Sequence, residues 1–136
     1  MTMRIVHTGV IALWASVVLF ASMLIFAPLA QAQTAAPIPL CEINRGLGVG
    51  MTGEDVECLQ RYLNWTHVNV AASGPGSLGQ ETIYYGPLTT GAVVQWQNQN
   101  STAVLAPLGL SSGTGFWGSS SFSHYVNIVR LALALR

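Results

Sequence analysis

A long uncharged segment near the N-terminus divides the chain into two parts. Residues 5–41 contain no Asp, Glu, Lys or Arg, and residues 10–27 are apolar except for two serines. Pro28 ends this apolar run, and the Ala-Gln-Ala sequence at positions 30–32 has the small residues that signal peptidase requires. The pattern predicts a signal peptide at residues 1–32 and export of the remaining chain.

An uncleaved membrane anchor is the alternative for the same segment. The 18 residues from 10 to 27 reach the length needed to span a bilayer and exceed the usual apolar part of a signal peptide. The small residues at 30–32 favour cleavage, which leaves residues 33–136 as one small domain.

Charge is scarce in residues 33–136, which carry four Arg and five Asp or Glu. A strongly cationic nucleic-acid binder and an acidic disordered tail are therefore excluded. Ser, Thr, Asn and Gln supply 29 of these residues, so the surface is expected to be polar but nearly neutral. Such a surface favours a neutral or zwitterionic partner, held by hydrogen bonds and aromatic rings.

Cys41 and Cys58 are the two cysteines, and both lie in the expected exported part. An even number of cysteines in a small exported domain predicts a disulfide, here joining an extended arm at residues 33–44 to the first helix. A metal pair would lack further ligands at suitable spacing, and a lipidated cysteine would have to lie at the cleavage site.

Apolar spacing predicts a helix from about Gly53 to Asn64, in an all-α fold. Thr52 and Asp55 resemble a capping box at its start. The expected inner face of this helix consists of Val56, Leu59, Tyr62 and Leu63.

Two further helices are predicted after Gly- and Pro-rich loops. One begins at Pro87, with Ala92, Val93, Trp96 and Gln97 on one face, and fades in the polar residues 98–101. The other begins at Ser119 and ends in an apolar, frayed tail at residues 131–135. The rings expected on inner faces are Tyr62, Trp96, Phe116, Phe122 and Tyr125.

A short pattern occurs twice, 32 residues apart. Residues 84–89 read Tyr-Tyr-Gly-Pro-Leu-Thr, and residues 116–121 read Phe-Trp-Gly-Ser-Ser-Ser. Each copy has two aromatic residues, a glycine, two further residues and a hydroxyl residue. The pattern predicts the same loop-to-helix turn at two places.

Three ordered blocks extend over residues 45–125. They are Gly50-x-x-Gly53-Glu54-Asp55-Val56-x-x-Leu59-Gln60-x-x-Leu63, then Tyr85-Gly86-Pro87-Leu88-Thr89-x-x-Ala92-Val93-x-x-Trp96-Gln97, then Gly113-x-Gly115-x-x-Gly118. In this order and register they resemble the peptidoglycan-binding domain 1 family. The resemblance implies a small three-helix bundle at residues 45–136 that binds bacterial cell wall.

Three departures from the family pattern affect what can be transferred. The segment between the first two helices is longer and richer in Gly and Pro than is usual in the family. Trp96 stands where Phe is more common, and Ser121 stands where Thr is usual. The family module usually targets a hydrolase or transpeptidase, whereas no catalytic residues are expected in this chain.

The candidate ligand-binding residues lie beside the predicted turns and on the outer faces of the first two helices. They are Tyr84, Tyr85, Trp117, Gln95, Gln99 and Arg61. An exposed ring could stack on a sugar or pack against a stem peptide, and Arg61 could meet a stem-peptide carboxylate. For the three aromatic residues, and for Trp65, burial in the core is an equally weighted alternative.

The sequence gives little support for catalysis, for a cofactor or for a metal site. Residues 113–118 match G-x-G-x-x-G, but no strand precedes them and no βαβ unit surrounds them. His67 and His124 have no companion ligands that would make a zinc set. Glu54, Asp55 and Glu57 crowd one helix start, where capping and the helix dipole explain them. The chain is therefore expected to be no enzyme and to have no cofactor.

The sequence thus predicts a non-catalytic module that binds peptidoglycan, through either the glycan strand or the stem peptide. A separately encoded cell-wall hydrolase is a further partner to consider, nucleic acid is not expected, and a membrane is expected only if the signal is uncleaved. The predicted location is the periplasm, cell wall or extracellular space. The alternative function is a structural or protein-interaction domain on the same scaffold without glycan binding.

Overall fold

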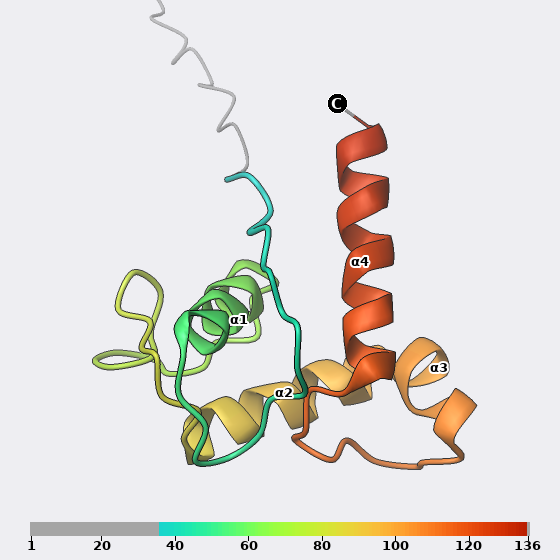
Figure 1. The fold of residues 1–136 in the computed structure, drawn as a ribbon, viewed down its shortest axis with the longest axis horizontal. Helices are drawn as coiled ribbons and strands as arrows, with labels where there is room; N and C mark the ends of the chain where they lie inside the picture. Colours follow the sequence, from blue (N-terminus) through green and yellow to red (C-terminus); the bar gives the residue numbers. More distant parts are fainter. Residues whose placement is uncertain (1–35, 136) are drawn as a thin grey trace, which may run out of the picture. The chain divides into compact units, whose positions relative to one another are not determined.

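The computed structural model describes residues 36–135 (Figure 1). These residues belong to one compact unit, Thr34–Arg136. The expected signal peptide at residues 1–32 lies outside the described residues. The compact unit contains its own buried core, which an independently folding domain requires, and a disulfide.

The described residues form helices joined by long loops, which confirms the all-α class. Between residues 36 and 135 the only β-type pairing consists of two isolated bridges, Leu47 with Trp117 and Thr52 with Tyr84. The helices are α1 (Glu54–Trp65), α2 (Pro87–Gln99), α3 (Ser101–Val104), the 3-10 helix η1 (Ala106–Leu108) and α4 (Ser119–Ala134).

Helix α1 begins one residue later than expected, and the proposed capping box is wrong. Its N-cap is Gly53, with no side-chain cap hydrogen bond. Asp55 instead accepts from Arg45 Nε at 2.7 Å, and Arg45 also donates to the carbonyl of Thr52 at 2.8 Å. The paired side chains of Arg45 and Asp55 lie so close to Gly53 that a side chain at this position would collide with them. Arg45, in the loop between the arm and α1, thus takes the place of a local cap.

Helices α2 and α4 begin where the sequence predicts, at Pro87 and Ser119. After α2, however, the chain forms the short helices α3 and η1 in a region expected to be irregular. Val104 at the end of α3 and Leu105 between the two helices are buried. Helix α4 stays helical to Ala134, so the expectation of a frayed tail from residue 131 is wrong.

The core is built around four aromatic side chains. Tyr62, Trp96, Trp117 and Tyr125 are each at most 3% exposed. The ring centroids of Tyr62 and Tyr125 lie 4.7 Å apart and meet edge to face, and those of Trp96 and Trp117 lie 4.6 Å apart. Such pairs add about 0.5–1.5 kcal/mol each beyond the burial of their area. These contacts join α1, α2, α4 and the loop before α4.

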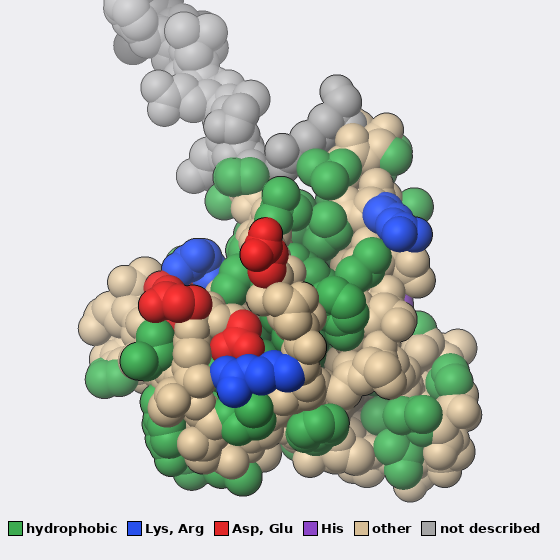
Figure 2. All heavy atoms as spheres, in the orientation of Figure 1, with side chains coloured by type: hydrophobic (Ala, Val, Ile, Leu, Met, Phe, Trp, Pro, Cys, Tyr) green, Lys and Arg blue, Asp and Glu red, His purple; other side chains and the backbone are tan. Residues whose placement is uncertain are grey.

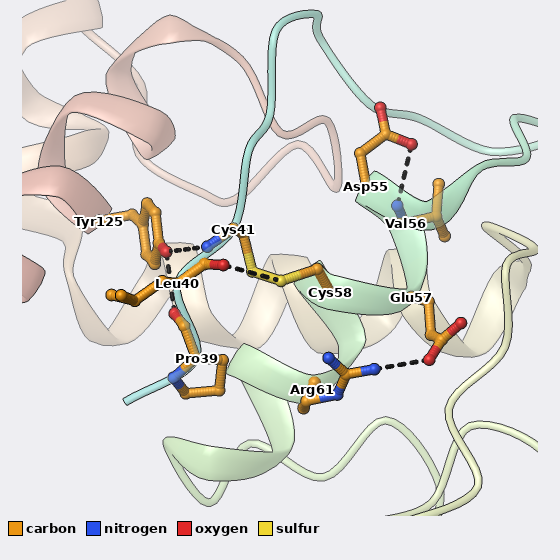
Figure 3. The surroundings of a disulfide bond; sticks show 9 residues. All are labelled: Pro39, Leu40, Cys41, Asp55, Val56, Glu57, Cys58, Arg61 and Tyr125. Carbon is orange, nitrogen blue, oxygen red and sulfur yellow. Dashed lines mark hydrogen bonds and ion pairs between the residues drawn. A yellow bond between two sulfur atoms is a disulfide. The ribbon is translucent and has the colours of Figure 1, made fainter. Parts of the chain in front are cut away.

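The Cys41–Cys58 disulfide is present and joins the arm to α1 (Figure 3). Beside it, the Tyr125 hydroxyl accepts from the Cys41 N–H at 2.6 Å and donates to the Pro39 carbonyl at 2.9 Å. The Trp65 indole N–H donates to the Ala36 carbonyl at 2.9 Å. The arm is therefore held by side chains of both α1 and α4 as well as by the disulfide.

Candidate functional site

Two loop-to-helix turns lead into α2 and α4, and they have the same backbone shape. Gly86 has φ −94° and ψ −175°, and Gly118 has φ −94° and ψ −170°. In both turns the glycine N–H donates to the carbonyl two residues earlier, and the glycine carbonyl accepts from the amide four residues later. The repeated sequence pattern therefore corresponds to a repeated structure.

The aromatic pair before each glycine is divided between surface and core. Tyr84 is 50% exposed and Phe116 is 51% exposed, whereas Tyr85 and Trp117 are 0% and 1% exposed. In extended backbone, successive side chains point in opposite directions, so only the first ring of each pair reaches solvent. The expectation of exposed rings is thus wrong for Tyr85 and Trp117, and so is the inner-face assignment of Phe116.

The buried aromatic residues fix the turns instead. The Tyr85 hydroxyl donates to the Gly115 carbonyl at 2.6 Å, which connects the first turn to the second. Burial raises the pKa of this hydroxyl, so it stays protonated and remains a donor. Residue 85 also exchanges backbone hydrogen bonds with the loop before α1, because its N–H donates to Met51 and its carbonyl accepts from Gly50.

Each turn is also held by a buried glutamine from the preceding long helix. Gln60 of α1 accepts from the Thr82 N–H at 2.7 Å and donates to the Tyr84 carbonyl at 2.9 Å. Gln97 of α2 accepts from the Thr114 N–H and donates to the Phe116 carbonyl, both at 2.8 Å. From the sequence, Gln60 had no predicted role, and Gln97 was predicted only to lie on one face of its helix. The sequence feature that could have indicated these roles is a glutamine side chain among the apolar residues on the buried face of each helix.

A shallow groove lies beside each turn. The first groove has a volume of about 190 Å³ and the second about 260 Å³. Their linings correspond position by position. The first groove is lined by Gln60, Tyr84 and Thr89. The matching positions in the second groove are Gln97, Phe116 and Ser121. The first is completed by Thr82, Leu88, Pro75 and Val70, and the second by Leu105, Leu108 and Leu110. Neither lining contains a charged side chain.

The two exposed rings are equally exposed but differ in their neighbours and in their hydrogen-bonding groups. Phe116 packs closely over Gly46 and also lies against Gly48 and Gly118, so the loop before α1 lies against one side of the ring. The Tyr84 ring is close to Gly86 alone among the glycines. Tyr84 also carries a hydroxyl that can donate or accept a hydrogen bond. The first groove is therefore the better candidate site.

The three polar candidates are exposed, but none of them lines either groove. Gln95 and Gln99 lie on α2, away from its buried face, as expected. Arg61 is paired with Glu57, one helical turn earlier, at 2.6 Å between Nη2 and Oε1. The structure therefore does not gather Gln95, Gln99 and Arg61 around Tyr84.

Two other ionisable groups, Asp55 and His124, make contacts within the fold. Hydrogen bonds from Arg45 lower the pKa of the Asp55 carboxyl, and burial lowers the pKa of His124. Within residues 36–135, no group of three or more His, Cys, Asp or Glu side chains is arranged to hold a metal ion. Both cysteines are consumed by the disulfide.

Comparisons with known proteins give no match for this chain. The chain matches no protein-family model, no curated protein and no solved structure at a significant level.

Proposed function

We propose that residues 45–136 form a peptidoglycan-binding-like domain with a three-helix scaffold, and that the exported protein binds bacterial cell wall without catalysing a reaction. The proposed site is the first groove. The observation that carries the proposal is the half-exposed Tyr84 ring, held in a fixed turn at the edge of an uncharged groove.

The chemistry of the groove suits a sugar or the backbone of a short peptide. Such ligands offer apolar faces and many hydroxyl or amide groups with little charge, and an aromatic ring beside hydrogen-bonding groups complements both. Thr82 and Tyr84 supply hydroxyls, while Val70, Pro75 and Leu88 supply apolar walls. The three sequence blocks that resemble the peptidoglycan-binding family include the turn that holds Tyr84.

Rigidity is the second support for the proposal. Gln60 binds both sides of the turn, because its Nε2 donates to the Tyr84 carbonyl and to the Thr89 hydroxyl, each at 2.9 Å. A ring held in place loses little conformational freedom on binding, so more of the contact energy appears as affinity.

Co-sedimentation with purified peptidoglycan sacculi tests the proposal. Residues 33–136 with the disulfide intact are expected to bind saturably, and Tyr84→Ala is expected to weaken binding about tenfold because a stacking face is lost. Phe116→Ala is the matched control, since this ring has the same exposure and turn position but faces the other groove.

Both variants should be checked for cooperative unfolding before binding is compared. If the folded wild-type domain remains in the supernatant, the proposal is wrong and the alternative of a structural or protein-interaction domain is favoured. Equal loss of binding in the Tyr84 and Phe116 variants would contradict the assignment to the first groove.

A further inference from the structure

The C-terminal part of α4 extends away from the core with its leucines uncovered. Leu131 is 66% exposed, Leu133 is 48% exposed and Leu135 is 87% exposed. Tyr125 is the last residue of α4 that is fully buried. Large exposed apolar side chains that cluster in this way mark a surface that meets an apolar partner.

These leucines do not form a single stripe. At 100° per residue, Leu131 and Leu135 lie about 40° apart, whereas Leu133 lies on nearly the opposite side of the helix. A groove on a protein partner covers one stripe of a helix, and this arrangement would leave part of the apolar surface in water. An apolar environment that surrounds the end of the helix on all sides would cover all of these leucines.

Charge on α4 is consistent with a position at a lipid surface. Arg130 is the single charged side chain of α4 and is exposed. A cationic side chain can extend its apolar stem along lipid while its guanidinium reaches phosphate headgroups. None of the helices described between residues 36 and 135 is long and apolar enough to cross a membrane. A shallow insertion of the helix end, with Arg130 at the level of the headgroups, suits leucines that lie on both sides of the helix.

The arm places further apolar residues at the same end of the domain. Tyr125 holds the arm at Pro39 and Cys41, and from this point the arm and α4 continue toward the same end (Figure 1). Leu40 is 63% exposed. Figure 2 shows hydrophobic side chains gathered around the arm and α4, whereas the acidic groups visible in this view lie beside the arm and over the rest of the domain.

The sequence leading into this end would hold it near lipid in the alternative where residues 10–27 are retained as an anchor. Residues 10–27 form an apolar run of membrane-inserting length, and only residues 28–35 separate it from Ala36. Whether that run is cleaved or retained, the chain enters the domain at the end where the leucines of α4 lie exposed.

We infer that this end of the domain, formed by Leu40, Leu131, Leu133 and Leu135, inserts shallowly into a phospholipid surface. The exported domain then rests on the membrane, with α4 as its contact element, independently of any anchor at residues 10–27. This inference does not rest on peptidoglycan binding, because the first groove contains none of these four residues.

Vesicle flotation tests the inference on residues 33–136, whose core and disulfide are complete without the N-terminal segment. The probe is a vesicle of phosphatidylethanolamine and phosphatidylglycerol. The wild-type domain is expected to float with the vesicles, and Leu131→Gln combined with Leu135→Gln is expected to weaken binding at least about tenfold, because two inserting side chains are lost.

Val49→Gln combined with Leu78→Gln is the matched control, since these side chains are 67% and 72% exposed but lie in loops outside α4. This control is expected to float as the wild type does, and helical content and unfolding temperature should be unchanged in both variants. The inference is overturned if the wild type does not float, or if the α4 variant floats equally well. It is also overturned if sedimentation shows a dimer that the α4 variant disperses while vesicles bind neither protein.

Discussion

Replacing Gln97 by leucine is expected to lower the free energy of unfolding by about 3–4 kcal/mol. Gln97 Oε1 accepts from the backbone N–H groups of Thr114 and Gly115 at 2.8 and 3.1 Å. Its Nε2 donates to the Phe116 carbonyl at 2.8 Å. Leucine fills a similar volume but leaves three backbone groups without this partner, and a buried unsatisfied group costs about 1–3 kcal/mol.

Urea denaturation followed by circular dichroism measures the effect of Gln97→Leu. Gln95→Leu is the control, because Gln95 lies on the same helix but is exposed, and such a change is expected to stay within about 0.5 kcal/mol. A loss below about 1 kcal/mol for Gln97→Leu would show that the second turn is held by packing alone. An equal loss in both variants would point to helix propensity as the cause.

Removing the disulfide by Cys41→Ser combined with Cys58→Ser is expected to destabilise the domain by about 3 kcal/mol. The two cysteines are 17 residues apart, and closing a loop of this length in the unfolded chain gives an entropic contribution of this size. The arm would also lose its covalent connection to α1, although Ile38 and Ile43 are buried and Tyr125 still holds Pro39.

The loss should appear as a lower urea midpoint, and chemical reduction of the wild type should reproduce it. Hydrogen exchange provides a local readout, because the Leu47 and Trp117 amides pair with each other's carbonyls and should exchange faster when the arm loosens. A double variant as stable as the oxidised wild type would show that the noncovalent contacts of the arm suffice.

The sequence was most informative where a pattern repeats along the chain. Apolar spacing predicted α1, α2 and the start of α4, and an even number of cysteines in a domain expected to be exported predicted the disulfide. Short helix α3 was not predicted, because four residues are too few to show a helical period. The cap of α1 was missed for a different reason, since Arg45 reaches Asp55 across ten residues and no local pattern encodes that contact.

The candidate site could be predicted only in part. The repeated aromatic-glycine pattern identified both turns, but it could not say which ring of each pair is buried. That choice depends on the loop before α1, which pairs with Tyr85 and Trp117 through Met51 and Leu47. The grooves could not be predicted at all, because their walls come from loops such as residues 70–76 that carry no periodic signal.

An NMR titration of the isotopically labelled domain, residues 33–136, with a soluble disaccharide–peptide fragment of peptidoglycan tests the proposed site most directly. Binding at the first groove predicts that amide shifts concentrate at residues 82–89, around Tyr84, while residues 114–121 of the matching turn stay nearly unchanged. Shifts confined to another surface, or no shifts at millimolar fragment with a folded domain, would contradict the proposal that this groove binds cell wall.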